Sequence, residues 1–166
     1  MSTLPAHLAE AAHELVALAA ARGVSMATAE SCTGGLVAAS ITEIAGSSAV
    51  LERGFVTYSN AAKAESLAVP VAVIAQHGAV SEEAARAMAE GALFNSHAAI
   101  AVSITGIAGP GGGSEDKPVG LVWFGLARHG GVTLTERHVF AGLDRHGVRE
   151  SAALEALRLL TEAVRA

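Results

Sequence analysis

The chain has 166 residues, of which 51% are hydrophobic and 16% charged, and its formal net charge is -5. This length and composition predict one domain with a substantial core, and they exclude a disordered chain. The acidic balance and the lack of a Lys/Arg cluster argue against nucleic-acid binding. No apolar run is long enough to span a bilayer, and residues 1–22 have acidic side chains and no basic start, so neither a membrane anchor nor a signal peptide is expected.

Cys32 is the only cysteine in the sequence. An internal disulfide is therefore impossible, which is typical of a protein from the reducing cytoplasm. The small number of charges also leaves much of the surface apolar, which favours burial of part of it in a homo-oligomer.

The first part of the chain predicts a helix, a strand and a second helix. Leucines recur on one helical face over residues 4–18, and Gly23 can close this helix. Residues 24–29 predict a strand. The apolar residues that follow recur at helical spacing, which predicts a helix that begins near Thr33 and ends in a loop at 45–48.

The middle of the chain alternates in the same way. Residues 49–58 are rich in Val, Phe, Thr and Tyr, as strands are, and a short helix is expected from Asn60 until Pro70 stops it. Ser81 is followed by two glutamates and predicts the N-cap of a helix that reaches Phe94.

The last part of the chain adds three strands and a helix. Residues 98–104 predict a buried strand and residues 106–118 a loop. Residues 119–127 and 132–140 flank a glycine turn and predict a hairpin, so part of the sheet is antiparallel. Asp144 is the expected N-cap of the last helix. Helices before, between and after strands predict a single three-layer α/β/α domain with a mixed sheet.

The segment Thr28–Gly35 joins the first strand to the second helix and is the main candidate for chemistry. Ser31 and Thr33 are expected at a helix N-terminus, where unpaired backbone N–H groups and the helix dipole attract a phosphate, a carboxylate or an oxyanion. Gly34 and its neighbour would let a ligand approach the backbone. The alternative is that Ser31 or Thr33 only caps the helix.

Ser31, Lys63 and Tyr58 form the most specific chemical set. A serine hydroxyl needs a base, and a lysine can be that base only if burial or a neighbouring positive charge lowers its pKa. The alternative is that Lys63 is a solvated residue on a short helix and that Tyr58 has its hydroxyl at the rim of a strand. Sequence spacing cannot decide whether the three side chains meet.

Three other positions have a functional and a structural interpretation. Thr105 and Gly106 end a buried strand, where ligands of open α/β sheets bind, although the glycine loop after them matches neither nucleotide fingerprint. Arg145 can pair with a phosphate or carboxylate, or it can be a surface residue. Cys32 is expected to be a buried structural thiol rather than a nucleophile. The seven histidines show no metal-ligand spacing, so no metal is expected.

Six sequence blocks together resemble the CinA C-terminal domain family. They are Thr28–Gly35, Ala45–Ser48, Arg53–Asn60 with Lys63, Gly78–Ser81, Ser103–Gly112 and Lys117–Gly120. They occur in the family's order over nearly the whole chain. The resemblance implies a three-layer fold with a mixed, mostly parallel five-stranded sheet, and homodimers or higher assemblies. It also implies the stand-alone form, without the molybdopterin-binding-like domain of longer members.

The family includes nicotinamide-nucleotide amidohydrolases, which convert nicotinamide mononucleotide (NMN) and water to nicotinate mononucleotide and ammonia in pyridine-nucleotide salvage. The resemblance implies that Ser31 is the nucleophile, that Lys63 is its base and that Tyr58 orients or relays the proton. It implies no metal or organic cofactor. The residues expected to bind substrate are Cys32, Thr33, Gly34, Gly46, Ser48, Thr105, Gly106 and Arg145.

Two other functions remain open at this point. A paralogue can keep the fold and the pocket and act as a nucleotide-binding or stress-linked interaction protein, because a fold does not fix a function. Alternatively, the chain is an amidase for another phosphorylated small molecule. A panel of amide substrates distinguishes the three possibilities.

Overall fold

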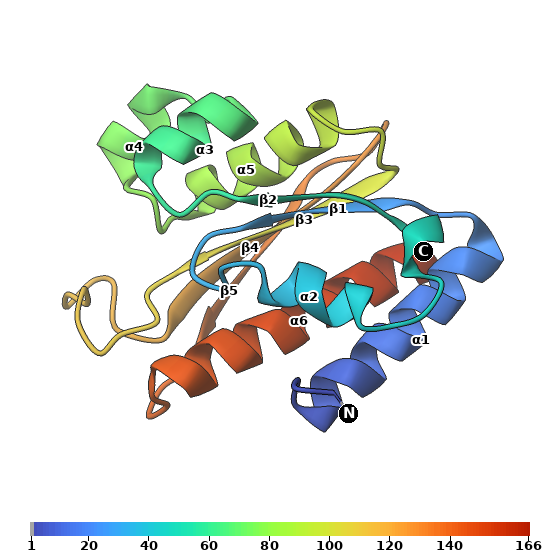
Figure 1. The fold of residues 1–166 in the computed structure, drawn as a ribbon. Coiled ribbons are helices and arrows are strands. Elements are labelled where there is room, and N and C mark those ends of the chain that lie inside the picture. The colour runs from blue at the N-terminus through green and yellow to red at the C-terminus, as the bar shows by residue number, and fades with distance from the viewer. Residues whose placement is uncertain (1) are drawn as a thin grey trace.

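The computed structural model describes residues 2–166 and shows one five-stranded sheet between two layers of helices (Figure 1). The strands are β1 (Met26–Glu30), β2 (Leu51–Val56), β3 (Ile100–Gly106), β4 (Leu121–Arg128) and β5 (Leu134–Val139). The helices are α1 (Ala6–Arg22), α2 (Leu36–Thr42), the 3-10 turn η1 (Ser47–Ala49), α3 (Asn60–Leu67), α4 (Val71–His77), α5 (Glu82–Phe94) and α6 (Arg145–Arg165). The predicted three-layer fold with a mixed sheet is confirmed.

The strand order is β2-β1-β3-β4-β5. β1 pairs in parallel with both β2 and β3, whereas β4 is antiparallel to β3 and to β5. Four strands therefore run in one direction and β4 runs in the other. The carboxyl ends of β1 and β3 lie at the same edge of the sheet, which is where open α/β sheets bind their ligands.

The two faces of the sheet differ in the size of their side chains. Helices α3, α4 and α5 lie on one face, and α1, α2 and α6 on the other (Figure 1). Under α5 the sheet presents small residues, among them Ala27, Ala29 and Ala101. The hydroxyl of Ser103 donates to the Ala85 carbonyl of α5 over 2.6 Å. The Ala-rich composition thus brings α5 very close to the strands.

The opposite face contains the larger core. Its fully buried members include Leu15, Met26, Ile104, Phe124 and Leu157. Burial of one such side chain stabilises the folded state by about 1.5–3 kcal/mol. This core ties α1 and α6 to the sheet and makes a rigid base for the loops at the carboxyl ends of the strands.

Several predicted element ends are confirmed. Gly23 ends α1 in a left-handed conformation with φ of 64°. The Ser81 hydroxyl accepts from the Ala84 N–H, and the Asp144 carboxylate accepts from the Gly147 N–H, so both residues are N-caps. The hydroxyl or carboxylate satisfies a backbone donor that has no partner inside the helix.

One helix start was predicted wrongly, and one helix was not predicted. The second helix does not begin near Thr33 but at Leu36, because residues 31–35 form a turn and Gly35 has φ of 100°. The helix expected from Asn60 does end before Pro70, but the sequence did not predict the additional helix α4, of which Pro70 is the N-cap position. A proline at such a position lacks only an N–H that has no helical partner anyway.

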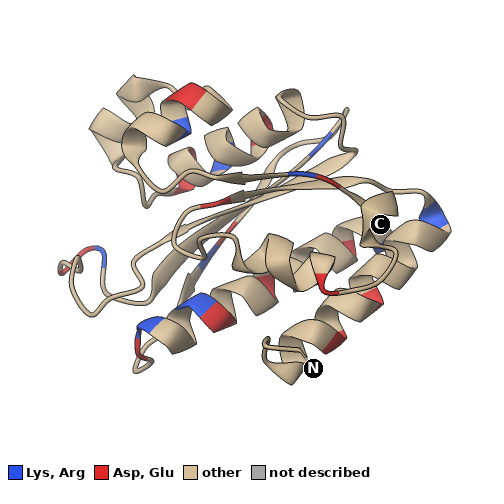
Figure 2. Cartoon of the chain, viewed as in Figure 1, with Lys and Arg blue, Asp and Glu red and all other residues tan. Residues whose placement is uncertain are grey.

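Figure 2 shows acidic and basic residues interspersed over both helical layers and the sheet. None of the helices described within residues 2–166 is both long enough and apolar enough to cross a membrane.

Candidate active site

Ser31 follows the last residue of β1 and continues the sheet by one hydrogen bond. Its N–H donates to the Ile104 carbonyl of β3 over 2.9 Å. All five residues of β1 are buried, and Ser31 itself is only 8% exposed. The hydroxyl is therefore held on a rigid strand end at the carboxyl edge of the sheet.

Lys63 contacts Ser31 from α3, which belongs to the helical layer of α3, α4 and α5. Ser59 begins α3 by accepting from the Ala62 N–H, and this places Lys63 in the next turn, where its side chain is 1% exposed. The Nζ atom lies 2.9 Å from Ser31 Oγ and donates to the Thr57 carbonyl over 2.9 Å. The structure thus brings together the serine and lysine that the sequence could only nominate.

Burial lowers the pKa of the Lys63 amine below its ordinary value. The cause is desolvation: burial removes the water that would stabilise the charged, protonated amine, so the neutral form is favoured. No ion pair of Lys63 with a carboxylate exists in residues 2–166 to oppose this effect; the pairs of that range involve other basic residues, such as Arg53, Arg86 and Arg158. A neutral lysine beside a serine hydroxyl has the chemistry of a general base.

Ser31 and Lys63 open into a cleft of about 290 Å³. Of the predicted site residues, it is lined by Ser31, Cys32, Tyr58, Lys63, Thr105, Gly106 and Arg145. No carboxylate of residues 2–166 lines the cleft. A second hollow of about 460 Å³ shares Ala108 and Arg145 with it and extends toward Arg149.

Arg145 and Tyr58 meet at the mouth of the cleft. The Nη2 atom of Arg145 donates to Tyr58 Oη over 2.8 Å, and Nη1 donates to the Gly109 carbonyl over 2.8 Å. Tyr58 is 60% exposed. Within residues 2–166 the Tyr58 hydroxyl accepts from Arg145 and bonds neither Ser31 nor Lys63, so its role in orienting or relaying the proton stays a prediction.

Thr105 and Gly106 form the wall at the end of β3. The Thr105 hydroxyl donates to the Ala79 carbonyl over 2.7 Å, so its proton is already used. A Cβ atom on Gly106 would lie 3.1 Å from Cys32 Sγ and closer still to Val122. Glycine is required there because the two strand ends approach each other so closely.

Cys32 follows Ser31 in the chain and is buried. Burial raises the pKa of the Cys32 thiol to about 12, so the thiolate is absent near neutral pH. The expectation of a buried structural thiol agrees with this position.

Glu30 occupies the N-terminus of α2, which the sequence suggested for a ligand. Its side chain is fully buried, with Oε1 accepting from the Val37 N–H over 2.9 Å and Oε2 from the Ala38 N–H over 3.1 Å. The carboxylate satisfies the first helical donors and faces the positive end of the dipole. The Val37 and Ala38 N–H groups are therefore not available to an oxyanion, and the oxyanion role stays a prediction for the turn before α2.

Within that turn, the backbone N–H groups of Cys32, Thr33 and Gly35 have no hydrogen-bond partner among the described residues, whereas those of Ser31 and Gly34 donate to Ile104 and Ser31. The Thr33 side chain is fully buried away from the cleft, and Gly34 lies beside Arg149. The predicted contributions of Thr33 and Gly34 therefore reduce to their backbone.

Gly46 and Ser48 lie outside the cleft of this chain. They precede the amino end of β2, whereas Ser31 follows the carboxyl end of the parallel neighbour β1. The five residues of β1 separate the two ends by roughly 16 Å, at about 3.3 Å per residue. Their role in substrate binding therefore stays a prediction, to which the cleft of this chain adds no support.

The structure adds cleft residues that the sequence reasoning missed. They are Asn60, Ala79, Val80, Ile107, Ala108, Gly111 and Gly112. Glu30 and Arg149 were missed as supports of the Ser31 turn. Two features of the sequence could have indicated these supports. Glu30 is an acidic residue inside a strand expected to be buried, and Arg149 lies one helical turn after Arg145 on the same helix.

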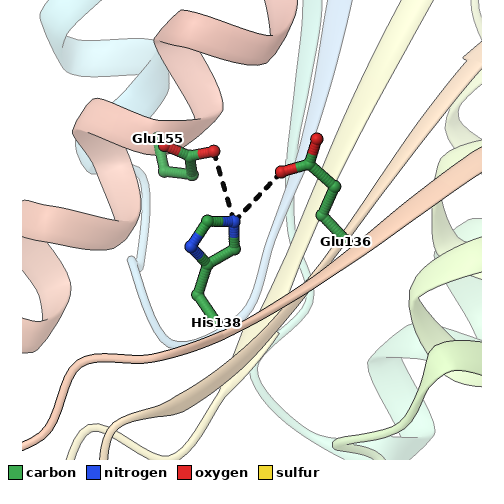
Figure 3. Close-up of side chains that lie close together, drawn as sticks. All are labelled: Glu136, His138 and Glu155. Atoms are coloured by element: carbon green, nitrogen blue, oxygen red, sulfur yellow. Dashed lines mark hydrogen bonds and ion pairs between the residues drawn. The ribbon is translucent and has the colours of Figure 1, made fainter.

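A second cluster of titratable side chains lies away from the cleft, where β5 faces α6. His138 Nε2 lies 3.0 Å from Glu136 and 3.3 Å from Glu155 (Figure 3). Their ligand atoms lie within 4.8 Å of one another, which suits a metal ion. Arg158 pairs with both carboxylates and already supplies the positive charge that a metal would bring. The cluster is therefore complete as an ion-pair network.

The chain is similar in sequence to known proteins over most of its length. Residues 8–164 match the profile of the CinA C-terminal domain. The chain is 59% identical over 140 residues to nicotinamide-nucleotide amidohydrolase PncC of Escherichia coli K12, covering 84% of each chain. It is 54% identical over 151 residues to a CinA-like protein of Anaeromyxobacter dehalogenans, covering 91% of this chain and 36% of that protein.

Solved structures have the same fold. The competence/damage inducible protein CihA of Agrobacterium tumefaciens superposes with a TM-score of 0.96 at 44% identity over 100% of both chains. The competence damage-inducible protein A of Klebsiella pneumoniae gives a TM-score of 0.90 at 39% identity, covering 95% of this chain and 97% of that chain. The match extends over nearly every helix and strand, and the chain belongs to the CinA C-terminal domain family.

Proposed function

We propose that the protein is a nicotinamide-nucleotide amidohydrolase that hydrolyses the carboxamide of NMN to nicotinate mononucleotide and ammonia. The observation that carries this proposal is the 2.9 Å distance between Lys63 Nζ and Ser31 Oγ at the bottom of a cleft without carboxylates. The name of the E. coli relative supports the substrate class.

The first step is attack by Ser31. The neutral Lys63 amine keeps one N–H on the Thr57 carbonyl and offers its lone pair to the Ser31 hydroxyl. As Lys63 takes the proton, Oγ bonds to the carboxamide carbon, and the carbonyl oxygen becomes an oxyanion. The partner-free N–H groups of Cys32 and Thr33 are the available donors to that oxyanion.

The second step expels ammonia. The Lys63 ammonium returns its proton to the amide nitrogen, the C–N bond breaks, and an ester of Ser31 remains. A water molecule then loses a proton to Lys63, attacks the ester carbon and releases the nicotinate carboxylate with the Ser31 hydroxyl restored. Lys63 thus serves as base and acid in both halves of the reaction.

Arg145 is the proposed anchor for the substrate phosphate. Both of its recorded hydrogen bonds go to uncharged oxygens, those of Tyr58 and Gly109, and no carboxylate of residues 2–166 forms an ion pair with it. A guanidinium at the mouth of a cleft that lacks a counterion suits a bidentate phosphate. A phosphate held there would place the remote carboxamide at Ser31, and binding energy from that end would lower the barrier.

We further propose that the protein acts in pyridine-nucleotide salvage in the cytoplasm and assembles as a homodimer or a higher homo-oligomer. The exposure of Phe94 (85%) and Val132 (81%) supports an assembly, since such side chains favour burial. Light scattering on the purified protein measures the assembly size.

Ammonia release from purified protein and NMN, with a chelator present, tests the proposed function. The wild type and the Ser66→Ala variant should release ammonia, whereas Ser31→Ala should not. Ser66 is an exposed residue of α3 outside the cleft and controls for the loss of one hydroxyl. Ammonia from another phosphorylated amide but not from NMN would change the substrate, and no release from any amide would refute the proposal.

A further inference from the structure

Arg149 holds the turn that carries the nucleophile. From α6 its Nε atom donates to the Cys32 carbonyl and its Nη2 atom donates to the Thr33 carbonyl, each over 3.0 Å. We propose that Arg149 is a positioning residue that sets the directions of the two oxyanion-binding N–H groups. This inference rests on the proposed function, because it concerns the same reaction.

The first N–H group is fixed through a single peptide plane. The carbonyl of Cys32 and the N–H of Thr33 belong to the same peptide unit, which is planar and trans, so the two groups point in opposite directions. Because Arg149 Nε holds this carbonyl toward α6, the Thr33 N–H must point away from α6. Rotation of this peptide unit would break the bond with the guanidinium.

The second N–H group is fixed through two planes in succession. Arg149 Nη2 holds the Thr33 carbonyl, which sets the direction of the Gly34 N–H in the same peptide unit. The Gly34 N–H donates to the Ser31 carbonyl over 3.0 Å. That carbonyl shares its peptide unit with the Cys32 N–H, so the Cys32 N–H also has a defined direction.

Together with the Gly35 N–H, these two N–H groups are the ones of residues 31–35 that the described residues leave unused. Ser31 and Gly34 donate to Ile104 and Ser31, and the first donors of α2 are satisfied by Glu30. In the described range, the Cys32 and Thr33 N–H groups have no partner. Because Arg149 bonds only to carbonyl oxygens of this turn, these N–H groups stay free for a ligand.

The contact requires a planar fork, and its neighbour Gly34 is favoured by a positive φ rather than by lack of space. Gly34 has φ of 59°, and a Cβ atom there would lie 3.5 Å from Arg149 Nη2. No carboxylate of residues 2–166 forms an ion pair with Arg149, and both of its recorded side-chain hydrogen bonds go to this turn. A lysine would keep the charge but could not hold two carbonyls in one plane.

Steady-state kinetics of Arg149→Lys with NMN test the inference. Misdirected donors weaken only the transition state, so kcat should fall by about 10²-fold, the usual loss for one oxyanion donor, while KM stays within about threefold. Arg149→Ala should lose at least as much and regain part of its kcat with added guanidinium ion. Arg158→Lys, on the outer side of the same helix, is the matched control and should keep wild-type kinetics.

A raised KM with unchanged kcat would mean that Arg149 binds substrate, and unchanged kinetics would mean that it has no part in the reaction; either result overturns the inference. A second measurement does not depend on the substrate. In ¹⁵N NMR spectra of the ligand-free enzyme, Arg149→Lys should shift the amide signals of Cys32, Thr33 and Gly34, and Arg158→Lys should not.

The two proposals fail in different ways. If the wild type releases no ammonia from NMN, the proposed function is lost, and the NMR spectra still decide whether Arg149 orders the turn. If the wild type is active and these amide signals are the same in Arg149→Lys, the positioning role is refuted and the function stands.

Discussion

The Nζ atom of Lys63 lies 2.9 Å from the Oγ atom of Ser31, although α2, η1 and β2 separate the two residues in the sequence. Lys63 is almost fully buried, and its second hydrogen bond goes to a carbonyl rather than to a carboxylate. An amine in such surroundings is stabilised in its neutral form, which is the form that can activate a serine.

Removal of the Ser31 hydroxyl should abolish turnover. Ser31→Ala deletes one oxygen from a partly enclosed site, so the fold should be retained while kcat falls by about 10³-fold or more. Ammonia release measures the activity, and circular dichroism confirms the fold. Near-normal turnover in this variant would remove Ser31 from the role of nucleophile.

The rate should rise with pH as Lys63 loses its proton. Because burial lowers the pKa of Lys63 below its ordinary 10.5, the increase in kcat/KM should be centred below that value. In Lys63→Met, kcat/KM should be lower by about 10³-fold or more at every pH, because the base is absent. A wild-type profile that is flat with pH would contradict the assignment of Lys63 as base.

The same lysine should make the protein less stable at low pH. Its pKa is lower in the native state than in the unfolded state, so the unfolded state binds more protons between the two values, and the free energy of unfolding rises with pH over that range. Lys63→Met should therefore be more stable than the wild type at neutral pH, with an advantage that shrinks as the pH approaches 10.5. Urea unfolding at several pH values measures this difference.

Arg145 should act on the phosphate end of the substrate. Arg145→Ala should reduce kcat/KM for NMN by about 10- to 10²-fold, the range expected for a lost hydrogen bond to a charged group. For nicotinamide riboside, which has no phosphate, the same substitution should change kcat/KM by less than about twofold. An equal loss with both substrates would show that Arg145 acts elsewhere than on the phosphate.

Cys32 should resist alkylation. Its thiol has a pKa raised to about 12 by burial, so at pH 7.5 the reactive thiolate is scarce. Incubation of the wild type with iodoacetamide should leave both its mass and its ammonia release unchanged. Rapid inactivation together with a mass increase at Cys32 would show that the thiol is ionised and accessible.

Glu30 should contribute to stability through α2. Glu30→Gln keeps one acceptor for the Val37 and Ala38 N–H groups but removes the charge at the helix N-terminus, which should cost about 1–2 kcal/mol in the free energy of unfolding. Glu30→Ala leaves both donors without the carboxylate and should cost more. Denaturant unfolding, with Glu10→Gln at an exposed position of α1 as control, measures the difference.

The sequence by itself determined the order of elements and most of their ends, because these depend on local chemistry. Ser81 and Asp144 cap helices with their own side chains, and Gly23 adopts the left-handed conformation that ends α1. The alternation of helices and strands was enough to predict the layers. Ser31, Lys63 and Arg145 were visible as chemistry-bearing residue types at element ends.

Only the tertiary structure decided which of those residues meet. Lys63 reaches Ser31 because α3 crosses the end of β1, whereas Gly46 and Ser48 lie at the other end of the parallel strands. Glu30 occupies the start of α2, so the donors left for an oxyanion are those of the turn that Arg149 holds from α6. Contacts between segments far apart in the chain depend on packing of the whole core, and no local pattern encodes them.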